Sequence, residues 1–148
     1  MGCAEPAWLG EREVLRLKPM VIERWHKLIA SHDPSGLDDL LADEATFFSP
    51  IVHTPQVGKA LTAIYLGAAM QILDNGTFHY VNEWYAERSA VLEFEVVVEG
   101  ITIQGVDMLH WNAADRIVRF KVMVRPLKAI NLLHQLMARA LQAGAPVR

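Results

Sequence analysis

The sequence has 148 residues, of which 52% are hydrophobic, a composition that suits one domain with a sizeable core and excludes a disordered chain. It carries 14 basic and 17 acidic residues for a net charge of −3, without a basic stripe, so nucleic acid is not an expected partner. A single cysteine excludes an internal disulfide, and no apolar run reaches membrane-spanning length, so we expect a cytoplasmic protein with no membrane partner.

Helices are predicted for most of the first half of the chain. Residues 17–32 show a helical pattern, because Val21, Trp25 and Leu28 fall on one face and charged residues fall elsewhere. The elements expected next are a short helix over 37–41, a strand over 46–49, a loop over 50–57 and a long apolar helix over 58–73. Residues 1–16 precede this pattern and are expected to form an N-terminal arm.

Four strands and a last helix are predicted for the second half. The expected strands cover 77–87, 91–99, 101–112 and 116–125, and an amphipathic helix covers 126–142. The second strand alternates, with one face formed by Leu92, Phe94, Val96 and Val98. We expect a single domain over residues 17–143, followed by a C-terminal tail over 144–148.

This order of elements, helices first and then mostly antiparallel strands, indicates an α+β fold. We expect a cone-shaped, curved, mixed or antiparallel β-sheet, with the N-terminal helices packed on its concave face and a C-terminal helix. A cone of this kind commonly keeps a pocket at its open end, where a small molecule binds.

Asp107 is the most informative single residue, because aspartate is depleted inside strands. Its neighbours at alternate positions, Gly105 and Leu109, indicate that its side chain points to the concave face. Burial there raises the pKa of a carboxyl group, and a protonated carboxylic acid can stabilise a developing enolate or alkoxide. The alternative is a structural acid that pairs with a backbone amide or with a nearby arginine.

Three parts of the chain carry a family resemblance: LDDLLADEATFFSP at 37–50, VGKAL at 57–61, and GVDML at 105–109 together with DRIVRF at 115–120. In these segments the chain resembles the nuclear transport factor 2-like superfamily, in its SnoaL-like bacterial branch. That superfamily includes ketosteroid isomerases, polyketide cyclases, limonene epoxide hydrolases and scytalone dehydratase. The resemblance covers about residues 17–126 and implies the cone-shaped fold, which hosts many chemistries and also non-catalytic members.

Compared with the ketosteroid isomerases, the resemblance places Asp107 at the protonated oxyanion-hole aspartate, Trp25 at the oxyanion-hole tyrosine and Ser49 at the aspartate base. Tryptophan still donates a hydrogen bond through its indole N–H, whereas serine is not an unassisted base for a carbon-bound proton. We therefore do not expect ketosteroid isomerisation by the family mechanism. Val122 stands near a position of the Asp–Arg–Asp set of the epoxide hydrolases, a set that this chain lacks.

Two further residues are candidates for the pocket. His53 lies in a loop between Pro50 and Pro55, where it is either the base that Ser49 cannot be or a surface histidine. Tyr65 is expected to face the cone from a helix, either as a ligand contact or as a core aromatic. We thus predict two catalytic residues, Asp107 and His53, and four substrate contacts: Trp25, Ser49, Tyr65 and Val122. The histidines show no metal-ligand spacing, so neither a metal nor a cofactor is expected.

Three functions remain open at this point. In the first, the protein binds a small hydrophobic ring-bearing molecule and performs cofactor-free isomerisation, cyclisation or dehydration. In the second, the same pocket binds such a ligand without reaction, and in the third the chain is a structural subunit of a larger assembly. A mixed charged and apolar outer sheet face, with Glu93, Glu95, Lys121 and Met123, predicts a homodimer through that face.

Overall fold

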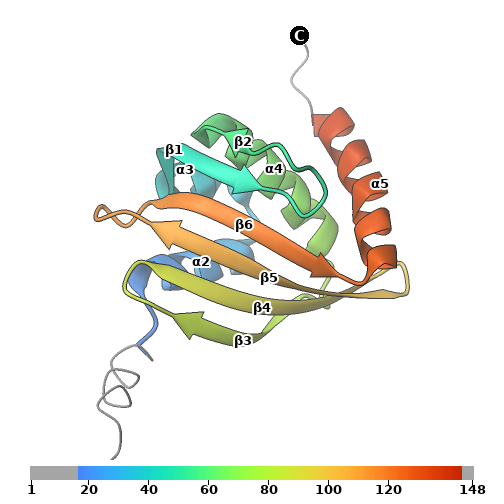
Figure 1. Ribbon diagram of the computed structural model, residues 1–148, viewed down its shortest axis with the longest axis horizontal. Coiled ribbons are helices and arrows are strands. Elements are labelled where there is room, and N and C mark those ends of the chain that lie inside the picture. Colours follow the sequence, from blue (N-terminus) through green and yellow to red (C-terminus); the bar gives the residue numbers. More distant parts are fainter. Residues whose placement is uncertain (1–16, 145–148) are drawn as a thin grey trace, which may run out of the picture.

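A curved six-stranded sheet, covered by helices on one face, is the frame of the molecule (Figure 1). The computed structural model describes residues 17–144, and the predicted arm over residues 1–16 and the last four residues of the predicted tail lie outside that range. The predicted α+β fold, with N-terminal helices and a C-terminal helix around a mixed curved sheet, is confirmed. No helix within residues 17–144 combines the length and the apolar composition needed to cross a bilayer.

The helices and strands follow the predicted order. The helical elements are α2 (Met20–Ser31), the 3-10 turn η1 (Pro34–Gly36), α3 (Leu37–Leu40), α4 (Lys59–Leu73) and α5 (Leu127–Gly144). The strands are β1 (Leu41–Phe48), β2 (Gln56–Val57), β3 (His79–Tyr85), β4 (Ser89–Val98), β5 (Ile101–Trp111) and β6 (Ile117–Arg125).

The strands are arranged in the order β2-β1-β6-β5-β4-β3. The segment from β3 to β6 is an antiparallel meander, because each strand pairs with the next one along the chain. β6 also pairs with β1, in parallel, so the last strand of the sequence lies in the interior of the sheet. Figure 1 shows α2 and α4 behind the sheet and α5 standing at one end of it.

The first strand is longer than the sequence indicates. We expected a strand over 46–49, whereas β1 begins at Leu41, directly after α3. Its pairing with β6 is irregular between Leu41 and Thr46, and the exposed residues Asp43 and Glu44 lie in this stretch. An irregular register removes the two-residue alternation by which a strand is recognised, which explains the missed residues.

The core lies between the concave face of the sheet and the helices. The predicted alternation of β4 is confirmed, because Leu92, Phe94, Val96 and Val98 are all buried. From the helical side the core receives Trp25 of α2, Leu66 of α4 and Leu133 of α5. The start of α4 is tied to β1, since the Thr62 hydroxyl donates to the carbonyl of Ala45 over 3.0 Å.

Gly105 allows a close approach that any larger residue prevents. It pairs with Phe94 across β4 and β5, and a Cβ atom added at Gly105 would lie 2.5 Å from the ring of Phe94 and 2.6 Å from the carbonyl oxygen of Met123. The ring can move only by leaving its place in the core, and the carbonyl belongs to a paired strand.

We therefore expect Gly105→Ala to lower the free energy of unfolding by about 1–3 kcal/mol, the usual cost of overpacking. Gly67→Ala is the matched control, because in helix α4 the new methyl would meet Pro34 at an ordinary 3.8 Å. There the added side chain should be neutral or stabilise by up to about 1 kcal/mol. Urea denaturation of both variants measures the difference, and equal stabilities would contradict this account of Gly105.

Candidate ligand pocket and its buried acid

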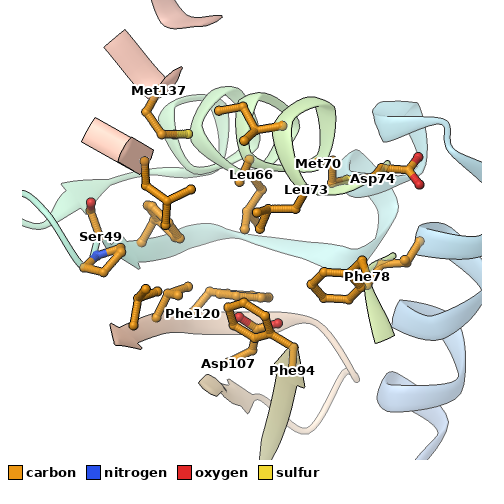
Figure 2. Close-up of a pocket in the computed structure, with 18 of the residues that line it drawn as sticks. Ser49, Leu66, Met70, Leu73, Asp74, Phe78, Phe94, Asp107, Phe120 and Met137 are labelled. Atoms are coloured by element: carbon orange, nitrogen blue, oxygen red, sulfur yellow. The ribbon is translucent and has the colours of Figure 1, made fainter. Parts of the chain in front are cut away.

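A cavity of about 300 Å³ lies between the concave face of the sheet and helices α2, α4 and α5 (Figure 2). Most of its wall is apolar, and the larger apolar side chains on it include Phe47, Leu66, Met70, Phe78, Phe94, Phe120, Val122, Leu133 and Met137. The residues on the wall that carry polar side-chain atoms are Trp25, His32, Ser49, Asp74, Tyr80 and Asp107. An apolar cavity with a few polar groups is the usual form of a site for a small organic molecule.

Asp107 lies on the floor of this cavity, in the middle of β5. It pairs with Leu92 on one side and with Val122 on the other, and only 7% of its surface is exposed. The hydroxyl of Tyr80 donates a hydrogen bond to Asp107 Oδ2 over 2.6 Å. The indole Nε1–H of Trp25 donates in turn to the Tyr80 oxygen over 2.9 Å.

These three side chains form a directed hydrogen-bond chain. Each proton in it points toward Asp107, since Trp25 only donates and Tyr80 has a single proton to give. Within residues 17–144 the other carboxyl oxygen of Asp107, Oδ1, forms no hydrogen bond. When Asp107 is protonated on Oδ1, this proton is not used by the hydrogen-bond chain and can be donated to a ligand.

Burial raises the pKa of Asp107 to about 7, and the hydrogen bond from Tyr80 acts in the opposite direction. Burial and the neighbouring Asp107 also raise the pKa of the Tyr80 hydroxyl well above its usual value of 10.0, so this group stays a donor. A carboxyl group that takes up and releases its proton near neutral pH suits general acid catalysis.

The cavity brings together four of the six residues predicted for the site. Asp107, Trp25, Ser49 and Val122 all lie on its wall. The oxygen of Ser49 accepts from the backbone N–H of Ile51 over 3.1 Å, which caps the turn after β1. Its hydroxyl proton remains available as a donor, so the serine suits ligand contact rather than proton abstraction.

The structure does not bring the other two predicted residues to the cavity. His53 is exposed in the loop before β2 and is not part of the wall. Tyr65 is half-buried on α4 and packs on Phe47, with ring centroids 5.8 Å apart, outside the wall of the cavity. The tyrosine therefore fits the core-aromatic alternative that its position on a helix left open.

Sequence reasoning missed Tyr80, the residue that contacts Asp107 directly. A lone tyrosine in a strand carries little signal, and the pairing of β3 with β4 shifts between Tyr80 and Asn82, which obscures which side chains face inward. Phe94, which lies opposite Tyr80 on the neighbouring strand, is the feature that could have indicated that Tyr80 faces inward.

Fold and site together define a class of protein: a cone-shaped α+β protein that encloses a buried carboxylic acid in an apolar cavity. A family model described as the SnoaL-like domain matches residues 22–120. The chain belongs to the SnoaL-like family, within the nuclear transport factor 2-like superfamily. A comparison with curated proteins gives no significant match.

Several solved structures are similar to this one. A steroid delta-isomerase from Pseudomonas aeruginosa is 34% identical with a TM-score of 0.81, over 87% of this chain and 96% of that chain. A protein with a cystatin-like fold from Silicibacter pomeroyi DSS-3 is 26% identical with a TM-score of 0.81, over 89% of this chain and 92% of that chain. A protein with a ketosteroid isomerase-like fold from Catenulispora acidiphila DSM 44928, in complex with trimethylamine, shares the fold at 12% identity and a TM-score of 0.58, over 76% and 90% of the two chains.

The raised pKa of Asp107 makes the stability of the protein depend on pH. The usual pKa of 3.8 applies in the unfolded chain and about 7 in the folded one, so the folded state holds a proton that the unfolded state releases between these values. The stabilisation that this bound proton gives the folded state is fully present below about pH 4 and is lost as the pH rises through 7.

We therefore expect Asp107→Asn, which cannot ionise, to gain stability relative to the unchanged protein as the pH rises from 4 to 8, by about 2–4 kcal/mol. Chemical denaturation across this range measures the unfolding free energies of both proteins. Their difference reports on Asp107, because the titration of all other groups is common to the two and cancels. A difference that stays constant with pH would contradict a raised Asp107 pKa.

Proposed function

We propose that the protein binds a small, mostly apolar, ring-bearing carbonyl compound and carries out cofactor-free acid–base chemistry on it. The observation that supports this proposal most is the carboxyl group of Asp107 in an apolar cavity, held by Tyr80 and free at Oδ1 within the described part of the chain. A protonated acid at this place donates to a carbonyl oxygen and stabilises the enolate that forms when a neighbouring carbon passes its proton to solvent water. The name of the relative from Pseudomonas aeruginosa, a steroid delta-isomerase, agrees with this class of reaction.

A second candidate is a protein that binds the same ligand without reaction. It is favoured by Ser49, which cannot take a proton from carbon and whose oxygen already accepts a backbone hydrogen bond. Both candidates need the same contact between Asp107 and a carbonyl oxygen, so the contact is tested first and turnover second.

A two-ring fused cyclohexenone is the probe for the contact, because a ketone oxygen only accepts hydrogen bonds and so needs the protonated form of Asp107. By isothermal titration calorimetry we expect its affinity to fall as the pH rises from 5 to 9, with a midpoint near the Asp107 pKa of about 7. Asp107→Ala should weaken binding about tenfold at pH 6 and remove the pH dependence, as expected for loss of one hydrogen bond from an acid. Asp43→Ala, at a carboxylate whose side chain is 96% exposed, is the control and should bind like the unchanged protein.

An affinity for the probe that is the same in Asp107→Ala and in the unchanged protein would reject the proposal. If the contact holds, the β,γ-unsaturated isomer of the same ketone is added, and ultraviolet absorbance follows its conversion to the conjugated enone. Conversion that depends on Asp107 supports the enzyme, and binding without conversion supports the non-catalytic candidate.

For the outer sheet face we propose a second copy of this chain as the partner. The face carries exposed apolar side chains, with Trp84 54% and Met123 53% exposed. Its acidic residues, Glu93 and Glu95, lie on β4, and basic residues such as Lys121 lie on β6, on the other side of β5. A two-fold axis along β5 would place β4 of one copy over β6 of the other and so pair opposite charges.

This arrangement predicts that Met123→Glu converts a dimer into a monomer, because the new carboxylate would be buried against the partner without a matching charge. Sedimentation equilibrium measures the mass in solution. Ile64→Glu, at a residue of α4 that is 40% exposed and lies away from this face, is the control and should leave the mass unchanged. A monomer before any substitution would show that the chain does not pair through this face.

A further inference from the structure

A hollow on the outer face of the sheet, on the side away from the cavity, is lined by Thr46, Phe48, His110, Val118 and Arg119. Successive residues of a strand point to opposite faces, so Phe47 lines the cavity and Phe48 lines this outer hollow. Arg119 of β6 is the direct pairing partner of Thr46 on β1 and of His110 on β5. Three neighbouring strands therefore contribute side chains to the outer hollow.

Two cations lie beside the ring of Phe48. The guanidinium carbon of Arg119 is 5.5 Å from the centre of this ring, and Nζ of Lys121, the next residue of β6 on the same face, is 5.2 Å from it. Among residues 17–144 neither cation forms an ion pair with a carboxylate. The two positive charges repel each other across a single aromatic ring, and an anion bound next to them would offset this repulsion.

His110 adds a buried nitrogen atom at the same place. Its Nδ1 is shielded from solvent and has no hydrogen-bond partner among residues 17–144. A buried polar atom without a partner costs free energy, which a ligand that hydrogen-bonds to it recovers. Burial and the positive charges of Arg119 and Lys121 lower the pKa of His110. A bound anion acts in the opposite direction, because it favours the protonated imidazolium.

We propose that the outer hollow is a second ligand site, separate from the cavity, and that it binds a tetrahedral oxyanion of the phosphate or sulfate type. Arg119 presents a fork of N–H donors that matches such an oxyanion, Lys121 adds a positive charge, and the imidazolium of His110 adds an N–H donor. Donors from three side chains suit an anion with oxygens on several sides, whereas the two oxygens of a carboxylate lie in one plane.

Sulfate is the probe, because it keeps its charge between pH 5.5 and 8, so a change in affinity over this range comes from the protein. ¹H–¹⁵N NMR follows a titration with sodium sulfate at an ionic strength held constant with sodium chloride. We expect saturable shifts of the amide signals of Arg119 and Lys121, with a Kd of about 1 mM at pH 6. Arg119→Gln should weaken binding about tenfold or more, as loss of a charge-assisted donor predicts.

Arg139→Gln is the matched control, because it removes the same charge from the exposed surface of α5. Figure 1 shows α5 after the end of β6, whereas Arg119 lies near the start of that strand. Arg139→Gln should bind sulfate like the unchanged protein. If Arg119→Gln and Arg139→Gln bind sulfate equally well, the outer hollow is not the site and the inference is wrong.

The affinity for sulfate should rise severalfold as the pH falls from 8 to 5.5, because binding favours protonated His110 and takes up a proton. The charged residues within two positions of His110 or of its partners in the strand pairing are Glu44, Glu87, Arg88, Arg119 and Lys121. Asp107 also titrates in this range, but it points into the cavity on the other face. His110→Phe, which removes one titrating group and keeps a ring, should bind more weakly and without the pH dependence.

Sedimentation equilibrium with and without sulfate distinguishes a free anion from a carboxylate of a second copy as the group that the outer hollow binds. For a free anion we expect the same mass at both concentrations. A mass that falls when sulfate is added would show that sulfate displaces a partner's carboxylate, and it would overturn the inference.

Discussion

The carboxyl group of Asp107, placed in an apolar cavity, is the constraint on which the site depends. An ionised carboxylate there would lose its hydration, so the group holds its proton up to a pH of about 7. Tyr80 and Trp25 satisfy one side of it with a chain of two hydrogen bonds, and these residues come from β3 and α2. This hydrogen-bond chain joins a helix to two strands, and it orders the acid on the floor of the cavity.

Much of the fold follows from patterns that can be read along the chain. β4 alternates strictly because one of its faces packs against the helices, and α2 shows a single apolar face for the same reason. The start of β1 could not be predicted, because its pairing with β6 is irregular and its exposed residues are acidic. A pairing partner some 70 residues away leaves no mark in a local pattern.

Asp107 was predictable from the residues alone, because an aspartate within a strand departs from a local preference. Trp25, Ser49 and Val122 followed from the family resemblance, and all four residues line the cavity. Tyr80 obeys every local preference for a strand, so nothing in its immediate sequence marks it as part of the site. His53 was selected for its chemistry and its loop, but whether a loop reaches a cavity depends on the path of the backbone in space, and this loop leaves it exposed.

The position of β6 has a consequence for how the chain assembles. β6 is the last strand along the sequence, yet it lies between β1 and β5 and pairs with both. During synthesis the N-terminal helices and β1 leave the ribosome first and β3 to β5 follow, so the two parts can be joined into one sheet only after residue 125 has emerged. Contacts between distant segments of this kind slow folding. Until β6 is inserted, the apolar surfaces that later enclose the cavity stay open to other chains, and the cavity is among the last features of the molecule to form.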